Sequence, residues 1–237
     1  MRMRKKKHGE ERLLACGEFI TDKPDLENLA AGTPVWLEIG AGKGGFACGM
    51  TQKYPNVSYY AMERVTDCVV LAAERAKKLS DEVGACSNLK FIVDTADNLT
   101  KLFDEESVDA IFLNFSDPWS KKGYAKRRLT HRRYLAVYFN LLKVGGTLTF
   151  KTDNVGLFDF SLEELCAVGL KCDVVTRDLH ASEWAENNVV TEYEANFSSQ
   201  GVKINMLRVT KPEGFSLEIP ENLSKDYVSR HPANDNT

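Results

Sequence analysis

The sequence predicts an α/β fold: a mostly parallel, seven-stranded sheet with helices on both faces and an antiparallel edge strand. Three observations predict it. Short apolar runs of strand length alternate along the chain with segments of helical periodicity. The first of these runs ends in a cluster of glycines, which is typical of a tight strand-to-helix turn. The 237 residues, 43% of them hydrophobic and 27% charged, suffice for one such domain.

Three strand–helix pairs are predicted in the first half of the chain. The first strand, at 35–39, is followed by glycines that turn the chain into a helix closed before Pro55. The same order of an apolar run and a helical segment then repeats twice. In chain order, the predicted pairs are 35–39 with 46–53, 57–62 with 65–79, and 89–93 with 96–103.

Four further strands are predicted in the second half. Residues 108–115 form the fourth strand, and a polar loop follows to about Leu129. Thr130 is expected to cap a helix that Gly145 and Gly146 end. The remaining predicted elements are a strand at 147–150, a helix at 157–168, and strands at 171–176 and 202–209. Because only a short segment separates the last two strands, we expect antiparallel pairing at that edge.

Composition excludes several classes of protein. No apolar run approaches the roughly 18–20 residues needed to cross a membrane, and the basic start of the chain lacks the apolar core of a secretory signal. The six cysteines form no Cys-x-x-Cys pair and the four histidines are scattered, so we expect reduced thiols, no metal site and a cytoplasmic location. We expect one domain over 31–211, a basic N-terminal extension over 1–30 and a flexible polar tail over 212–237.

The net charge of −3 hides a strongly basic window. Between Asp117 and Asp153 there is no acid, and the cations are Lys121, Lys122, Lys126, Arg127, Arg128, Arg132, Arg133, Lys143 and Lys151. Such a window presents a local positive field, for which phosphate groups are the usual target. The alternative is a solvated helix face, the commonest role of a charge run. Because seven of these cations crowd into 121–133 and would repel one another, we favour a contact with nucleic acid.

A glycine-rich turn follows the first strand. Its glycines fit two spacings found in nucleotide-binding turns, and they are Gly40, Gly42, Gly44 and Gly45. Glycines at such a turn let the backbone approach a ligand closely, under a helix N-terminus that favours oxygen-rich groups. Taken alone, the pattern is equally consistent with a tight turn that needs positive φ angles.

Acidic residues near three strand ends sharpen this interpretation. Glu63 lies 23 residues after Gly40, where an acid accepts both ribose hydroxyls of an adenosine. Glu38 precedes the glycine turn, where it suits an ammonium group and would repel a pyrophosphate, which favours S-adenosylmethionine over NAD. After the third strand, one of Asp94, Thr95 and Asp97 is expected to reach the adenine, and the sequence leaves that choice open.

A second polar cluster is predicted where the fourth and fifth strands end. Ligands of open α/β sheets bind at the carboxyl ends of strands, and residues 114–119, Asn-Phe-Ser-Asp-Pro-Trp, stand there. Pro118 stiffens the loop, and Trp119 offers a flat surface on which a base could stack. Asp153 ends the fifth strand and is expected beside Asp117 in space, although it could instead cap the following helix. Lys121 and Lys122 complete the cluster.

Five motifs together resemble the bacterial tRNA (guanine-N7)-methyltransferases, the TrmB family. They are Glu38-Ile-Gly-Ala-Gly-Lys-Gly44, Asn114-Phe-Ser-Asp-Pro-Trp-Ser-Lys-Lys122, Lys126-Arg-Arg-Leu129, Phe150-Lys-Thr-Asp-Asn154 and Thr191-Glu-Tyr-Glu194. The resemblance covers roughly residues 1–210 and implies a Rossmann-like class I methyltransferase. Two departures stand out: Ser120 replaces the proline usual after Asp-Pro-Trp, and the tail beyond Pro212 matches nothing in the family.

The resemblance also implies roles for single residues. The residues lining the S-adenosylmethionine pocket would be Glu38, Gly40, Gly42, Gly44, Glu63, Thr95 or Asp97, and Asp117. Asp117 would also be the catalytic residue. The substrate, a guanine in the tRNA variable loop (position 46 in standard tRNA numbering), would contact Lys121, Asp153, Thr191, Glu192, Tyr193 and Glu194. RNA would touch Gly123, Tyr124, Ala125, Lys126, Arg127 and Arg128. The enzyme would act as a monomer or homodimer without an obligatory protein partner. It would not associate with a membrane.

The chemistry of guanine agrees with this assignment. Its N7 carries an in-plane lone pair, so the enzyme chiefly needs to align N7 with the methyl group. A carboxylate can accept hydrogen bonds from the N1–H and N2 edge, which favours Asp117, Asp153 or Glu192 and Glu194 as guanine acceptors. Asp117 is also a candidate proton relay after the transfer, and the sequence leaves open which of the two roles it has. Alternatives are a methyltransferase of another RNA, a non-catalytic RNA-binding protein, a NAD-dependent oxidoreductase and a small-molecule methyltransferase. The last two leave the basic window without a role.

Overall fold

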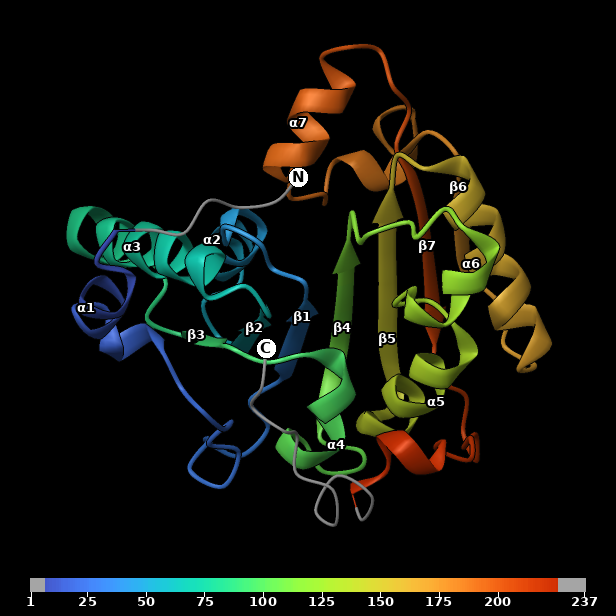
Figure 1. The fold of residues 1–237 in the computed structure, drawn as a ribbon, viewed down its shortest axis with the longest axis horizontal. Coiled ribbons are helices and arrows are strands. Elements are labelled where there is room, and N and C mark those ends of the chain that lie inside the picture. The colour runs from blue at the N-terminus through green and yellow to red at the C-terminus, as the bar shows by residue number, and fades with distance from the viewer. Residues whose placement is uncertain (1–6, 226–237) are drawn as a thin grey trace.

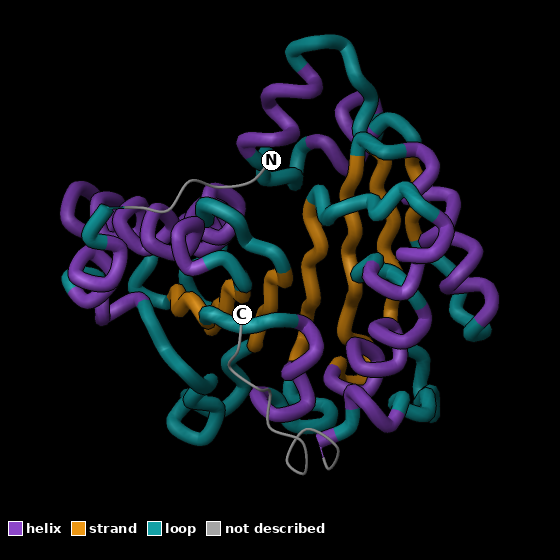
Figure 2. Tube along the Cα trace, in the orientation of Figure 1, coloured by secondary structure: helices purple, strands orange, loops and turns teal. Residues whose placement is uncertain are grey.

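The computed structural model describes residues 7–225, and the terminal residues 1–6 and 226–237 lie outside the described part. Seven strands form one sheet in the order β3-β2-β1-β4-β5-β7-β6. Figure 1 shows α2 and α3 beside the β1–β3 half of the sheet, α5 and α6 beside the other half, and α7 above the strand ends. Figure 2 shows the strands as a central layer, with loops joining them to the helices at both ends.

The sheet confirms the predicted fold. Its strands are β1 (Val35–Ile39), β2 (Ser58–Met62), β3 (Leu89–Ile92), β4 (Val108–Asn114), β5 (Leu142–Thr152), β6 (Val174–Thr176) and β7 (Asn205–Thr210). The five strands from β1 to β5 pair in parallel. The antiparallel pairing expected at the edge is present, because β7 runs antiparallel to both β5 and β6.

The helices form two layers because side chains alternate along each strand. The helices are α1 (Gly9–Leu14), α2 (Gly45–Lys53), α3 (Thr66–Val83), α4 (Leu99–Leu102), α5 (Arg132–Leu141), α6 (Val155–Ala167) and α7 (Glu192–Ser198). On β1, Leu37 packs into the core shared with α4, α5 and α6, whereas Trp36 packs with α2 and α3. Both faces of the sheet are therefore covered, as its apolar strands require.

The strand order creates a switch point between β1 and β4. From β1 the chain proceeds outward through β2 to β3, and then returns to place β4 on the other side of β1. In an open α/β sheet, ligands bind at the carboxyl ends of the strands that flank such a point, and the region between the loops after β1 and β4 is called the crevice below. Glu38 and the glycine turn lie on one side of this crevice, and residues 114–119 lie on the other.

The predicted ends of the α5 helix were wrong. Thr130 is buried and bonds the Ser161 hydroxyl at 2.7 Å, while the imidazole of His131 caps the helix by accepting from Arg133 N at 3.1 Å. The helix ends at Leu141, because β5 begins at once. Gly145 and Gly146, expected to stop the helix, lie inside β5, where the register against β4 shifts. A Cβ on Gly146 would stand 3.0 Å from Asp109 O, so glycine permits this irregularity.

Segments outside the expected domain core also pack against it. Cys16 and Phe19 are buried with α2 and α3, and Arg12 forms an ion pair with Glu74 at 2.7 Å. At the other end, Leu223 is buried in the core, and its carbonyl accepts from the Thr100 hydroxyl at 2.8 Å. Residues 9–21 and 212–225 are therefore docked, although their polar composition suggested extensions.

Within residues 7–225, no helix is long and apolar enough to cross a membrane. All six cysteines are free thiols; Cys16, Cys48 and Cys86 are buried, but Cys166 is exposed. The same residues contain no group of three or more His, Cys, Asp or Glu side chains that could hold a metal ion.

Candidate functional site

The glycine turn presents bare backbone to the crevice. Gly40, Gly42 and Gly44 have φ angles of 84°, 55° and 72°, which L-residues rarely adopt. A Cβ added to Gly40 or Gly42 would meet nothing within 4 Å, so the space above the turn is open. A Cβ on Gly44 would instead stand 2.8 Å from Ala72 Cβ, which fixes the turn against α3. The turn can therefore admit a ligand close to its N–H groups.

Glu38 is a buried acid at the base of the crevice. Its side chain is 2% exposed; Oε1 accepts from Asn114 Nδ2 at 3.0 Å, and Oε2 lies 3.5 Å from the Tyr59 hydroxyl. Burial raises the pKa of Glu38 to about 7, against the opposing effects of Asn114, Lys151 and Tyr59. A buried carboxyl with this pKa is poised to ionise when a cation comes beside it.

Glu63 stands at the end of β2 and ties the glycine turn to the next helix. Its Oε2 accepts from Gly42 N at 3.0 Å, and its Oε1 accepts from Val65 N at 2.9 Å. The carboxylate is thus held at the rim of the crevice, and each oxygen keeps a further lone pair for a hydroxyl donor.

The three candidates for the adenine contact have different partners. Asp94 Oδ1 accepts from Thr95 N at 2.6 Å, and the Thr95 hydroxyl accepts from Asp97 N at 3.3 Å. Asp97 Oδ1 accepts from Arg133 Nη2 at 2.6 Å and from the Tyr134 hydroxyl at 2.9 Å. Asp97 therefore holds α5 against this loop, whereas the exposed Thr95 is the least constrained of the three.

The Asp-Pro-Trp loop is strained and clamped. Phe115 and Trp119 have φ angles of 51° and 42°, in the left-handed region that non-glycine residues avoid. Arg128 holds the loop by donating to Pro118 O at 3.0 Å and to Trp119 O at 3.2 Å. Asp117 is consequently lifted into solvent, with its carboxylate 70% exposed and 3.7 Å from Arg64 Nη2.

Asp117 and Asp153 leave the sheet from neighbouring positions. Phe115 N donates to Lys151 O at 2.9 Å, so the two loops that carry these acids start side by side. Asp153 is half-buried, and Asn154, not Asp153, caps α6 by accepting from Leu157 N at 2.8 Å. The capping role considered for Asp153 is therefore wrong, which leaves its carboxylate available to a ligand.

The Thr-Glu-Tyr-Glu motif divides into structural and outward-facing residues. Thr191 and Glu194 form a capping box at the start of α7, and Glu194 is fully buried. Glu192 forms an ion pair with Arg75 of α3. Tyr193 is 58% exposed, and its ring stacks on Phe115 with centroids 6.3 Å apart. Glu194 cannot touch a base directly from its buried position.

Distant acids neutralise four of the nine cations in the basic window. Arg132 pairs with Glu164, Arg133 with Asp97, Lys143 with Asp109 and Lys151 with Glu194, while Arg128 holds backbone carbonyls. Within the window, all of which the structure describes, the exposed cations without an acidic partner are Lys121, Lys122, Lys126 and Arg127. Arg127 lies 5.0 Å from the Trp119 ring and 4.8 Å from the Tyr124 ring. The free positive charge is therefore concentrated in 121–127, directly after Asp117.

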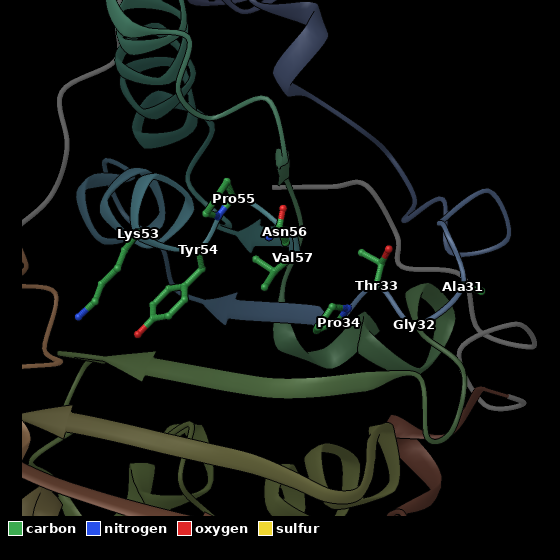
Figure 3. A pocket seen from close by; sticks show the side chains of 9 residues that line it. All are labelled: Ala31, Gly32, Thr33, Pro34, Lys53, Tyr54, Pro55, Asn56 and Val57. Atoms are coloured by element: carbon green, nitrogen blue, oxygen red, sulfur yellow. The ribbon is translucent and has the colours of Figure 1, made fainter.

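Two hollows lie away from this crevice. One, of about 460 Å³, is lined by residues that precede β1 and by the end of α2, at the opposite end of β1 from the glycine turn (Figure 3). The other, of about 600 Å³, lies between α5 and residues 217–222, and Arg132 and Arg133 in its wall already have acidic partners. Neither hollow is lined by the glycine turn, Glu38, Glu63 or Asp117.

Sequence reasoning missed the roles of three residues. Asn114 was read only as part of a motif, yet it is the hydrogen-bond donor to Glu38. Arg128 was assigned to RNA, yet it clamps the Asp-Pro-Trp loop. Lys151 was counted among the phosphate-binding cations, yet it is 2% exposed. The available signal for Lys151 was its place inside an apolar strand, after Phe150.

The crevice fits S-adenosylmethionine. Open space above Gly40 and Gly42 admits a ligand to the backbone, Glu63 at the end of β2 suits ribose hydroxyls, and Glu38 suits a cationic group. A pyrophosphate would instead meet the carboxyl of Glu38. The same arrangement of a glycine turn between two acids was expected from the sequence, and the structure adds that the acids are held by Asn114 and by Val65 N.

Comparisons with known proteins agree with this geometry. The family described as "Putative methyltransferase" matches residues 32–207. A curated tRNA (guanine-N(7)-)-methyltransferase of Lachnoclostridium phytofermentans is 38% identical over 205 residues, which cover 84% of this chain and 94% of that protein. One of Macrococcus caseolyticus, with the same name, is 36% identical over 212 residues, covering 87% and 98%.

Solved structures share the fold at lower identity. The 16S rRNA methyltransferase KamB superposes with a TM-score of 0.60 at 15% identity, over 81% of this chain and 96% of that one. The 16S rRNA (adenine(1408)-N(1))-methyltransferase of Catenulisporales acidiphilia, solved with its cosubstrate S-adenosylmethionine, gives 0.53 at 12% identity, over 90% and 96%. At these identities the likeness shows the class I methyltransferase fold alone.

Proposed function

The chain belongs to the tRNA (guanine-N(7)-)-methyltransferase family, and from this premise we propose that it methylates N7 of a guanine in the variable loop of tRNA. The methyl donor is S-adenosylmethionine. The observation that carries the proposal is the composition of the crevice. Glu38 and Glu63, which suit the cofactor, lie at the same switch point as the exposed Asp117 and the cations of 121–127 that have no acidic partner. A methyltransferase of small molecules has no use for those cations.

Within this proposal, the cofactor is held by groups from three strand ends. Glu38 would face its ammonium end, the turn at Gly40, Gly42 and Gly44 would lie under its centre, and Glu63 would accept from its ribose hydroxyls. Thr95 is the favoured adenine contact, because Asp97 is already engaged by Arg133 and Tyr134. S-Adenosylmethionine supplies an electrophilic methyl carbon bonded to a positively charged sulfur.

The protein's part in the reaction is alignment. The N7 lone pair of guanine forms a bond to the methyl carbon, and the carbon–sulfur bond breaks with its electron pair left on sulfur. N7 carries no proton, so no base is needed before transfer, and the gain is positional. Asp117 would accept hydrogen bonds from the N1–H and N2 edge and orient the ring, with Asp153 and Lys121 beside it.

Recognition of tRNA divides between base and phosphate contacts. A loop nucleotide can leave its stack and enter the crevice, where Tyr193 and Trp119 offer aromatic surfaces. The unpaired cations of 121–127 would hold phosphates without reading sequence. Because Thr191 and Glu194 form the α7 cap, we assign them an indirect role, and we assign the direct contacts of this motif to Glu192 and Tyr193.

The remaining expectations belong to the same proposal. We infer one catalytic domain over 31–211 and action without an obligatory protein partner, as a monomer or homodimer. Support comes from relatives of nearly the same length, 94% and 98% of which align with this chain. A tRNA substrate favours the cytoplasm. Of the tail expected to be flexible at 212–237, residues 212–225 pack on the core, and residues 226–237 lie outside the described part of the chain.

The test is to incubate the protein with methyl-labelled S-adenosylmethionine and unmodified tRNA transcripts, then digest the RNA and identify the labelled nucleoside. Label in 7-methylguanosine is expected, and it should vanish when the variable-loop guanosine is replaced. A ribosomal RNA fragment serves as the control substrate. Label in that fragment but not in tRNA would mean that the substrate is another RNA. If the protein binds the cofactor but labels neither RNA, tRNA is not its substrate.

A further inference from the structure

Lys151 is a buried cation that the reaction described above does not use. It is the second-last residue of β5, at the end of the sheet where the crevice opens, and it is 2% exposed. Its ammonium lies 4.7 Å from the centroid of the Phe46 ring, at the start of α2. Burial lowers the pKa of Lys151, and the nearby Glu194 opposes that effect. A buried charge of this kind is retained only where it is fully paired.

All three hydrogens of this ammonium are donated to a single segment. The acceptors are Glu194 Oε2 at 2.8 Å, Asn188 Oδ1 at 2.9 Å and Val189 O at 3.0 Å. Asn188 also donates to Glu194, so the acceptors are linked to one another. An ammonium has three donors, and here none is left for a ligand. Lys151 therefore fastens residues 188–194 to the sheet.

The opposite side of the same segment rests on α2. Lys53 Nζ donates to Asn187 O at 3.1 Å. One turn earlier, a Cβ on Gly49 would stand 2.6 Å from Val189 Cγ1, so the segment lies against bare helix backbone. The start of α2 is the glycine turn, which links this segment to the cofactor side of the crevice.

The segment also carries the outward-facing part of the Thr-Glu-Tyr-Glu motif. Glu194 serves both Lys151 and the α7 cap, because its Oε2 accepts from Thr191 N at 3.4 Å. With α7 so fixed, the Tyr193 ring stacks on Phe115, two residues before Asp117. Figure 1 shows α7 above the ends of β4 and β5. The proposed function places the entering base at these strand ends.

We propose that Lys151 is a positioning residue for the RNA substrate: through Glu194, Asn188 and Val189 it latches residues 187–198 over the strand ends, so that Tyr193 is preset beside the Asp117 loop. The idea rests on the proposed function, because it names what presents the base-binding side of that site. Without the latch, the segment spends part of its time open. The apparent association constant for tRNA is then the intrinsic one multiplied by the fraction of molecules that remain closed.

The first test compares hydrogen exchange in Lys151→Met with that in a matched control. Lys211 is likewise buried, 4% exposed, with Nζ donating to Glu106 Oε1 at 3.0 Å and to Leu142 O at 2.8 Å, but it lies at the other end of β5. Lys151→Met should speed amide exchange in residues 187–198 about tenfold or more, and Lys211→Met should leave these amides unchanged. Unchanged exchange in Lys151→Met would overturn the latch, as would equal acceleration throughout the chain.

A gentler pair of variants keeps the test decisive where Lys151→Met fails to fold. Asn188→Ala removes one acceptor of the ammonium without baring a charge, and Asn196→Ala changes an exposed asparagine of the same segment, whose backbone carbonyl still accepts from Ser199 Oγ at 2.9 Å. Faster exchange in 187–198 is expected for Asn188→Ala only. The same result in both variants would contradict the proposal.

Kinetics then separate positioning from general stability. Lys151→Met and Asn188→Ala should raise KM for tRNA about tenfold while kcat at saturating tRNA changes by less than about threefold. A fall in kcat with KM for tRNA unchanged would refute the positioning role. If the wild-type protein forms no 7-methylguanosine while the exchange pattern appears as predicted, the proposed function has failed and the latch has not.

Discussion

Replacing Glu38 with glutamine is expected to stabilise the protein free of cofactor while weakening its affinity for the cofactor. Burial holds the pKa of Glu38 at about 7, above its ordinary 4.5. Since the folded-state pKa is the higher one, ionisation is penalised only in the folded protein. Stability is therefore lost progressively as pH rises from about 4.5 to about 7, and the loss is constant at higher pH.

The size of this effect follows from the two pKa values. They differ by about 2.5, and at about 1.4 kcal/mol for each pKa unit the buried charge costs about 3 kcal/mol above pH 7. Glutamine keeps an Oε1 acceptor for Asn114 and has no charge to bury. Glu38→Gln should then exceed the wild type in stability by about 3 kcal/mol at pH 8, and this gain should fade toward pH 5.

Urea unfolding of the cofactor-free protein at pH 5, 6, 7 and 8 measures the gain, with the exposed Glu213→Gln as a control that should show none. Titration with S-adenosylhomocysteine, which carries the same ammonium group, measures the cost. At pH 6 about a tenth of Glu38 is ionised, so wild-type binding should be about tenfold weaker than at pH 8, and Glu38→Gln should lose this dependence. Equal gains at pH 5 and pH 8, or wild-type binding that ignores pH, would refute the reasoning.

Three further predictions concern other parts of the crevice. Arg127→Ala should weaken tRNA binding and reduce the slope of the log binding constant against log salt concentration by about 0.7–0.9, as filter binding measures. Arg128→Ala should in addition loosen the Asp117 loop and lower kcat, as methyl transfer at saturating tRNA measures. At saturating cofactor, kcat should be independent of pH from about pH 6 to 9, because N7 gives up no proton. A rise or fall of kcat with pH in the wild type that is absent from Asp117→Asn would contradict this. Gly44→Ala should cost more than about 1 kcal/mol in thermal unfolding, because φ is 72° and the new Cβ would stand 2.8 Å from that of Ala72.

The outcome for α5 shows how far local patterns reach. Its apolar periodicity predicted the helix, and the structure places it at 132–141. The pair Gly145–Gly146 is equally compatible with a helix stop and with an irregular strand, and nothing local chooses between them. The choice was made by β4, whose pairing with Leu142 draws the chain into the sheet before the glycines are reached.

The basic window shows the same limit for the site. Its lack of acids between Asp117 and Asp153 suggested nine cations free for phosphates. The acids that neutralise four of them come from elsewhere in the chain; for example, Asp97 pairs with Arg133, and Glu194 with Lys151. The exposed cations of the window that keep no acidic partner are Lys121, Lys122, Lys126 and Arg127, and separation along the sequence gives no sign of which cations these would be.

By itself, the sequence determined the strand and helix succession, the glycine turn and the acids Glu38, Glu63 and Asp117 near strand ends, because periodicity and turn chemistry act between near neighbours in the chain. The tertiary structure alone decided the strand order that opens the crevice, the burial that raises the pKa of Glu38, and the attachment of Lys151 to Glu194. Burial and ion pairing depend on which distant segments meet in space, and that is fixed only when the sheet closes.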